Sequence, residues 1–217
     1  MARRSLAKRL WYRTLQTGCQ LLGVALFRVR CGGRELMPST GPALVLANHQ
    51  SHLDPMLIGL ASPRQLNFLA RKTLFRFAPF RWLIQSLDAI SLDRDGVGLG
   101  GLKETLRRLK ADEAVLIFPE GTRSRDGAIA PLKPGFCALA RRAGARLVPA
   151  GIDGAYDAWP RRHTLPGIAS IHVQFGPPLL PEEVASLDDA ALVAEVEHRI
   201  RACHATARAS RLRAMAP

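Results

Sequence analysis

The regular alternation of short apolar segments with amphipathic segments most limits the folds open to this 217-residue chain. The apolar runs predict strands at residues 27–31, 43–47, 66–70, 89–92, 114–118, 146–152 and 168–175. The amphipathic segments predict helices at residues 55–61, 97–110, 134–143 and 188–209. Strands that alternate with helices form a largely parallel sheet, because each helix returns the chain to the same end of the sheet. We therefore expect an α/β fold, with a largely parallel central sheet flanked by helices.

Two of the predicted helices carry a single apolar face, which suits helices that cover a sheet. In residues 97–110, leucines fall three or four positions apart, at Leu99, Leu102, Leu106 and Leu109. In residues 188–209, the same spacing is met by Leu192, Val193, Val196, Ile200 and Cys203. Since no internal repeat or long linker interrupts this pattern, residues 31–217 are predicted to form one domain.

Residues 1–30 are predicted to form a basic amphipathic helix that associates with a membrane. Arginine and lysine are frequent in residues 1–13, and the apolar side chains of the helix are Leu10, Trp11, Leu15, Leu22 and Leu26. The longest clean apolar run, residues 21–27, is far shorter than the roughly 20 residues that cross a bilayer. No cleavage site follows it, so we expect no signal peptide. Such a helix would lie flat among lipid headgroups; the alternative is a soluble helix packed on the domain.

The net charge of +13 requires an anionic partner, and the two ordinary partners are nucleic acid and acidic phospholipid. The arginines are spread along the chain and form no readable nucleic-acid-binding module, so we expect an anionic membrane surface and no nucleic acid. A basic nucleic-acid-binding protein is the alternative from another class. Aromatic and basic residues alternate in residues 73–87, which suits either a membrane interface or a core.

Residues 48–54, with the sequence Asn-His-Gln-Ser-His-Leu-Asp, place an imidazole and a carboxylate five positions apart. On a continuous helix, His49 and Asp54 would point about 140° away from each other. They can meet only where the chain bends, as it does between a strand and a helix. Pro55 suits the first helical turn, and Asp54 is predicted to be its N-cap. A histidine held by an aspartate is a general base with a fixed tautomer.

A second polar loop, Phe-Pro-Glu-Gly-Thr-Arg-Ser at residues 118–124, also follows a predicted strand. Gly121 allows close approach of a ligand, while Thr122 and Arg123 offer donors for a phosphate. Glu120 is predicted to accept a hydrogen bond from a hydroxyl or to orient Arg123. In open α/β sheets ligands bind beyond the carboxyl ends of the strands, so both loops are expected to face one cleft.

These loops resemble blocks of the glycerophospholipid acyltransferase family, whose best-known members convert 1-acyl-glycerol-3-phosphate to phosphatidic acid. The first block is matched by Asn48, His49 and Asp54, and the third by residues 118–124. The second is matched by Arg71, Leu74, Phe75, Asp93 and Arg94, and the fourth by Leu147, Val148, Pro149 and Gly151. The blocks occur in family order over residues 40–155. Two positions depart from the pattern: Arg71 replaces the usual lysine, although Lys72 follows it, and Asp88 replaces a glycine.

The resemblance implies transfer of a fatty acyl chain from acyl-CoA or acyl-carrier protein to the hydroxyl of a lysophospholipid. The favoured acceptor is 1-acyl-sn-glycerol-3-phosphate, and another lysolipid is the alternative. The implied catalytic residues are His49 and Asp54, and the implied substrate-binding residues are Asn48, Ser51, Arg71, Lys72, Arg94, Glu120, Gly121, Thr122 and Arg123. No covalent acyl-enzyme is expected, because the chain lacks a nucleophile elbow and a cysteine beside His49. No cofactor or metal is implied, and the expected location is peripheral, on the cytoplasmic face of the membrane.

Two other kinds of protein fit parts of the pattern. A metallohydrolase would use His49, His52 and Asp54 as ligands, but the usual His-x-His-x-Asp-His spacing is absent and no other His/Cys pair completes a site. A lipid-binding protein without activity would retain the same loops. Four scattered cysteines favour a reduced compartment without structural disulfides. The remaining histidines are expected on the surface or in strands: His163, His172, His198 and His204.

Overall fold

The computed structural model of the chain describes residues 10–11, 14, 17–18, 27–71, 90–92, 99–163 and 165–216. Within these residues, a seven-stranded sheet has the order β1-β7-β6-β2-β5-β3-β4. The strands are β1 (Arg30–Gly32), β2 (Ala43–Ala47), β3 (Leu66–Arg71), β4 (Ile90–Leu92), β5 (Ala114–Ile117), β6 (Arg146–Asp153) and β7 (His172–Phe175). Every pairing is parallel except that of β6 with β7. The largely parallel central sheet predicted from the sequence is confirmed.

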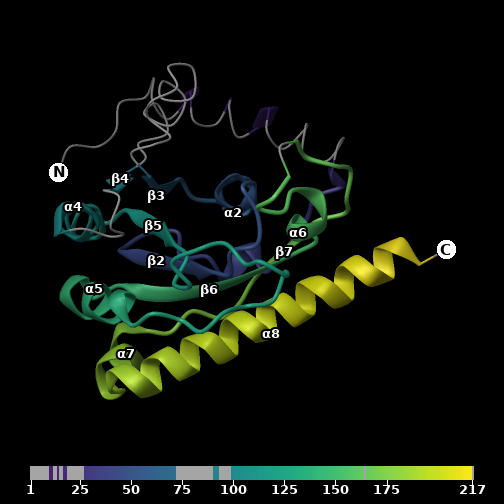
Figure 1. The fold of residues 1–217 in the computed structure, drawn as a ribbon. Helices are drawn as coiled ribbons and strands as arrows, with labels where there is room; N and C mark the ends of the chain where they lie inside the picture. The colour runs from purple at the N-terminus through teal and green to yellow at the C-terminus, as the bar shows by residue number, and fades with distance from the viewer. Residues whose placement is uncertain are drawn as a thin grey trace.

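Helices cover both faces of the sheet (Figure 1). On one face lie α2 (Asp54–Ala61) and the short α6 (Ala155–Ala158), whose buried apolar residues belong to one hydrophobic cluster. A second cluster on the other face contains residues of α4 (Leu99–Lys110), α5 (Gly135–Ala143), α7 (Pro181–Ser186) and α8 (Asp189–Met215). A short 3-10 helix, η1 (Arg34–Leu36), follows β1.

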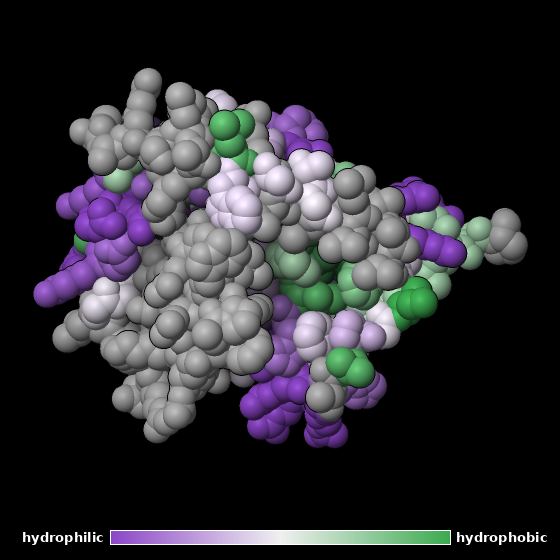
Figure 2. Space-filling model, turned by 90° about the horizontal axis from the view of Figure 1, so that it is seen from above, coloured by the Kyte–Doolittle hydropathy of each residue, from purple (hydrophilic) through white to green (hydrophobic). Residues whose placement is uncertain are grey.

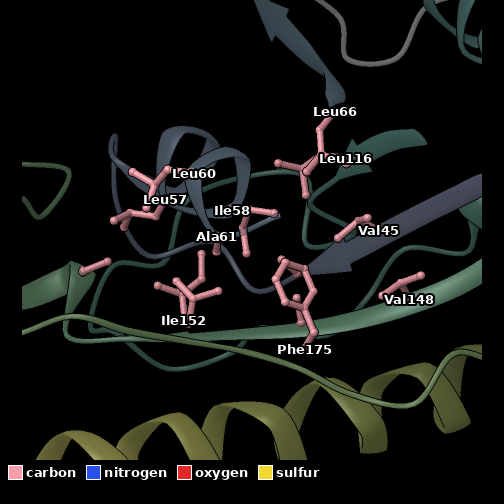
Figure 3. Packing of buried hydrophobic residues seen from close by; sticks show 14 of the residues in the cluster. Val45, Leu57, Ile58, Leu60, Ala61, Leu66, Leu116, Val148, Ile152 and Phe175 are labelled. Atoms are coloured by element: carbon pink, nitrogen blue, oxygen red, sulfur yellow. The ribbon is translucent and has the colours of Figure 1, made fainter. Parts of the chain in front are cut away.

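The central strand β2 shows why its sequence is apolar throughout. Alternate side chains point to opposite faces of a strand. Ala43, Val45 and Ala47 therefore belong to the cluster between the sheet and α2. Leu44 and Leu46 belong to the cluster between the sheet and helices α5 and α8. Figure 3 shows the first cluster, where Ile58 of α2 lies near Phe175 of β7. A strand buried on both faces carries apolar residues at every position, which is typical of parallel sheets.

The apolar faces predicted for two helices pack as expected. In α4, Leu109 is buried, and Leu102 and Leu106 pack against the same cluster. In α8 the buried residues are Leu192, Val196, Ile200, Cys203 and Ala207. The Asp188 side chain caps this helix by accepting a hydrogen bond from the Ala191 amide at 2.7 Å.

Several element boundaries differ from the prediction. Helix α8 continues to Met215 and not to residue 209, because the added residues include good helix formers and the first proline after the helix is Pro217. Strand β7 begins at His172 and not at residue 168. Pro166 and Gly167 lie just before the predicted start, and both residue types are unfavourable in strands. The short helices α6 and α7 were not predicted, since segments of four and six residues are too short for an apolar period.

The predicted membrane-associating helix of residues 1–30 and the segment 73–87 lie largely outside the described residues. The division of the chain at residue 30 stays a prediction. Among the described helices, none is both long and apolar enough to span a bilayer.

Candidate active site

The predicted meeting of His49 and Asp54 is confirmed, with His49 Nδ1 2.8 Å from Asp54 Oδ2. His49 lies in the loop that follows β2, and Asp54 is the first residue of α2, so the chain bends between them as expected. The predicted N-cap is wrong by one residue, because Leu53 occupies that position. Asp54 accepts hydrogen bonds from amides of the loop before the helix. An N-cap side chain would instead accept from amides in the first turn of the helix.

The Asp54 carboxylate holds the whole loop as well as the imidazole. Its Oδ2 accepts the backbone amides of Gln50 at 2.6 Å and Ser51 at 2.7 Å, and the residue is completely buried. A carboxylate can only accept, so the hydrogen it shares with His49 belongs to Nδ1. The neutral imidazole then keeps its lone pair on Nε2. The His49 side chain is 18% exposed, so solvent or a substrate can reach the ring, while the Asp54 side chain is fully buried.

The loop of residues 118–124 holds His49 from the other side. Strands β2 and β5 are parallel neighbours with Leu46 opposite Ile117, so the two loops leave the sheet side by side. The His49 amide donates to Glu120 Oε1 at 2.6 Å, and the His49 carbonyl accepts from the Ser124 amide at 2.7 Å. The Phe118 ring stacks on the imidazole, with a centroid distance of 4.0 Å and an interplanar angle of 15°. The expectation that these loops lie together is confirmed.

Both carboxylate oxygens of Glu120 accept hydrogen bonds from the protein backbone. Its Oε2 accepts the Ala130 amide at 2.9 Å, so each carboxylate oxygen bonds to the backbone of a separate segment. Burial raises the pKa of Glu120, and the two amide hydrogen bonds oppose that rise. The carboxylate thus fastens the segment after β5 to the His49 backbone, and its predicted contact with a substrate hydroxyl or with Arg123 stays a prediction.

Two further residues expected to bind substrate are built into the framework of the loop. The buried Asn48 amide exchanges two hydrogen bonds with the Ile152 backbone, at 2.9 and 2.8 Å, and joins the ends of β2 and β6. The buried Ser51 hydroxyl donates to the Trp159 carbonyl at 2.8 Å. Neither side chain lies at the protein surface.

The remaining residues of the second loop are nearer to solvent. Gly121 has a φ of +73°, in the left-handed region that favours glycine, and its amide closes a turn onto the Phe118 carbonyl at 3.0 Å. Gly121 and Thr122 are exposed, and Arg123 is half-buried. The pKa of His52 is lowered by burial and by the positive charge of Arg123, so that guanidinium lies within electrostatic range of His52.

The predicted cationic contacts from the second block are not tested by the structure. Arg71 is the last residue of β3, and its side chain is not described. Lys72 and Arg94 lie outside the described residues.

Two residues that border the site, Trp159 and Gln50, are not predicted by any sequence pattern. Trp159, directly after α6, lies with its ring centroid 5.1 Å from that of His52. Gln50 Nε2 donates to the Gly127 carbonyl at 2.7 Å and lies 3.3 Å from His204 Nε2 of α8. His204 was expected in a strand or on the surface; it lies against Gln50 and Asp153. Both contacts cross more than 70 residues of chain, so local sequence does not encode them.

Thiol and metal chemistry have few candidate groups in the described part of the chain. Cys31, Cys137 and Cys203 are free, and burial raises the pKa of Cys203 to about 11. Within the described residues, no three His, Cys, Asp or Glu side chains are grouped as ligands for a metal ion.

An imidazole held by a buried carboxylate, beyond the carboxyl end of a parallel strand, is typical of α/β proteins that use a general base. A family model described as Acyltransferase matches residues 28–153, which is more than half of the chain. The chain therefore belongs to the acyltransferase family.

Several characterised relatives are similar to this chain. The 1-acyl-sn-glycerol-3-phosphate acyltransferase of Bacillus subtilis (strain 168) is 30% identical over 127 residues, which are 58% of this chain and 63% of that protein. The 1-acyl-sn-glycerol-3-phosphate acyltransferase alpha of Mus musculus is 30% identical over 177 residues, which are 79% of this chain and 61% of that protein. The chain thus spans about three fifths of the length of these relatives.

The fold is also similar to a solved structure. The crystal structure of the 1-acyl-sn-glycerophosphate (LPA) acyltransferase, PlsC, from Thermotoga maritima superposes with a TM-score of 0.82. The match covers 95% of this chain and 83% of the other, at 24% sequence identity.

Proposed function

We propose that the protein is an O-acyltransferase that moves a fatty acyl chain from acyl-CoA or acyl-carrier protein to the free hydroxyl of a lysophospholipid. The proposed acceptor is 1-acyl-sn-glycerol-3-phosphate, and the product is phosphatidic acid. The observation that carries this proposal is the 2.8 Å contact between His49 Nδ1 and Asp54 Oδ2, in a chain of the acyltransferase family. The names of the relatives from Bacillus subtilis and Mus musculus support the choice of acceptor.

In the proposed reaction, His49 Nε2 removes the proton of the acceptor hydroxyl as its oxygen attacks the thioester carbonyl of the donor. The new C–O bond forms, a tetrahedral intermediate collapses, and the C–S bond breaks. The imidazolium then returns its proton to the departing thiolate. The buried Asp54 stabilises the positive charge on the ring during this cycle, and no acyl-enzyme is formed.

The surrounding contacts support this role because they hold the imidazole in one orientation. General-base assistance supplies about 10²–10⁴-fold, and positioning of the reactants adds to it. Phe118 and the hydrogen bonds to the His49 backbone leave the ring little freedom to turn. We assign the acceptor's phosphate to Arg123, the half-buried cation whose charge acts on His52, with Arg71, Lys72 and Arg94 as further candidates.

The test is a transfer assay on the His49→Ala variant with a panel of lysolipids and one acyl donor, with products identified by mass. We expect the turnover number to fall by about 10²-fold or more, because the proton acceptor is lost. His198→Ala is the matched control, since His198 is an exposed residue of α8.

The measurement separates the parts of the proposal. Turnover by His49→Ala close to that of the control would remove His49 as the base. Acylation of a different lysolipid by the wild-type protein, with 1-acyl-sn-glycerol-3-phosphate left unchanged, would correct the acceptor and keep the chemistry. Circular dichroism of each variant checks that the fold is retained.

A further inference from the structure

A cationic pocket is lined by Arg125, by Tyr156 of α6 and by the segment that follows α6. A cavity of about 250 Å³ is lined by Arg125, Tyr156, Pro160, Arg161, Arg162 and His163. Three of these residues are arginines, and none of the described lining residues is acidic. Guanidinium groups bind phosphate through paired hydrogen bonds, so the lining suits a phosphate ligand.

Contacts on both sides connect this pocket to the His49 loop. Arg125 lies two residues after Arg123, and its carbonyl accepts the Tyr156 hydroxyl at 2.8 Å. Pro160 directly follows Trp159, which accepts the Ser51 hydroxyl and lies against His52. The pocket is therefore built by the same two segments that border the candidate active site.

The same segment carries the two most exposed large apolar side chains of the described residues. Leu165 is 77% exposed and Ile168 is 88% exposed. They follow Arg161 and Arg162 by only a few positions, so apolar and cationic side chains share one short stretch. In Figure 1 the green stretch that follows α6 rises above that helix, on the same side of the sheet as α2. Figure 2 views that side and shows a recess with apolar residues in its floor.

We propose that residues 160–163 and 165–168 dock the protein onto an anionic phospholipid bilayer. Arg125, Arg161 and Arg162 hold a headgroup phosphate in the pocket, while Leu165 and Ile168 enter the acyl region. A soluble phosphate compound would use the cations but leave the two apolar side chains in water. A lipid covers both kinds of group at once, as amphipathic membrane-surface segments do. The inference deepens the proposed function, because it brings the His49 loop to the surface that holds the acceptor lipid.

Vesicle flotation without substrates tests the proposal. Vesicles of phosphatidylcholine alone are compared with vesicles that also contain phosphatidylglycerol. We expect R161Q/R162Q to weaken binding to the anionic vesicles by about tenfold or more, because each cation at a membrane surface contributes several-fold. The variant L165S/I168S is expected to weaken binding to both kinds of vesicle, again by about tenfold or more, because apolar area no longer enters the bilayer.

Matched controls remove similar groups elsewhere. K110Q/R142Q removes two exposed positive charges from α4 and α5, and Leu180→Ser removes a half-exposed leucine before α7. Both controls are expected to stay within about twofold of the wild-type protein, since long-range attraction is screened beyond about 10 Å in salt. All substituted positions are at the surface, so the variants are expected to fold.

Three outcomes decide the matter. Vesicle binding by the loop variants that equals that of the controls would overturn the proposal. So would normal vesicle binding by R161Q/R162Q together with a raised KM for the acyl donor, since the pocket would then hold the donor's phosphates. The His49→Ala variant is expected to bind vesicles like the wild-type protein. Loop-dependent vesicle binding in a protein that transfers no acyl group would sustain this inference and remove the proposed function.

Discussion

The imidazole of His49 is held in one orientation by contacts on several sides. Asp54 fixes its Nδ1, Phe118 covers one face, and Glu120 and Ser124 bind its backbone. Loops usually move more than the elements they join. Here the loop is fastened to its neighbour, so the ring's orientation is set before any substrate arrives. Preorganisation of this kind avoids the entropic cost of positioning a base during the reaction.

Replacement of Asp54 by Asn tests the charge of the carboxylate separately from its shape. The amide oxygen can still accept a loop amide, but it cannot stabilise an imidazolium, and its NH₂ group favours the wrong tautomer of His49. We expect the turnover number to fall by about 10²–10⁴-fold, with a smaller change in KM. The measurement is steady-state transfer to the lysolipid that the wild-type protein prefers, with Asp189→Asn of α8 as the control.

The sequence predicted the His49–Asp54 pair because one strand-to-helix bend decides it locally. It could not predict the partners of Asn48 and Glu120. Asn48 bonds to Ile152, 104 residues away, and Glu120 bonds to an amide of a different loop. Asn48 and Glu120 are polar and belong to the motifs of the candidate active site, yet both side chains are buried. What covers them depends on which strands are neighbours in the sheet. Strand order is a property of the whole sheet.

At the scale of elements, the close approach of α8 to β6 depends on one glycine. A Cβ atom at Gly151 would lie 2.2 Å from the His204 backbone nitrogen and 2.4 Å from the Cys203 carbonyl carbon. Because backbone atoms cannot turn aside, a side chain here would force the helix away from the sheet. Gly151 belongs to the fourth family block, and this packing gives its place in that block a physical reason.

Gly151→Ala is therefore expected to lower the free energy of unfolding, by about 1–3 kcal/mol or more, through overpacking. Gly100→Ala is the matched control, because Gly100 lies in α4 with no atom within 4 Å of an added Cβ. An alanine within a helix is favoured over glycine by up to about 1 kcal/mol, so the control should be neutral or stabilising. Urea unfolding of both variants gives the comparison. Equal stability of the two would show that α8 adjusts without cost.

Element type was predictable where a long periodic pattern exists, as in α4, β2 and α8. The boundaries were less so, because they depend on what the chain meets. The strand predicted at residues 168–175 contains Ile168, which is apolar and exposed, while Ile171 is buried. The sequence pattern gives no reason to expect different exposure for the two isoleucines. Their exposure differs because Ile171 lies next to the sheet and Ile168 lies beyond its end.

A charged network joins the C-terminal half of α8 to the sheet and to the candidate active site. Asp153, the last residue of β6, accepts Arg211 Nε at 2.5 Å, and its Oδ1 lies 3.4 Å from His204 Nε2. Arg211 also bonds to Asp157 of α6 at 2.9 Å. Since His204 touches Gln50, this network extends from α8 to the loop that holds His49.

The pH dependence of stability tests how much this network contributes. Burial alone would raise the pKa of Asp153, but hydrogen bonds from His204 and Arg211 and their positive charge outweigh it and hold the pKa below its ordinary value of 3.8. A depressed pKa in the folded state stabilises the protein above the ordinary value, and this stabilisation is lost as the pH falls through the folded pKa. Urea unfolding of the wild-type protein and of Asp153→Asn should therefore differ most near neutral pH, with the difference shrinking below about pH 4. Arg211→Met should show the same convergence, because it removes one of the partners. A difference that stays constant far below pH 4 would mean that packing, and not the charge of Asp153, links α8 to the sheet.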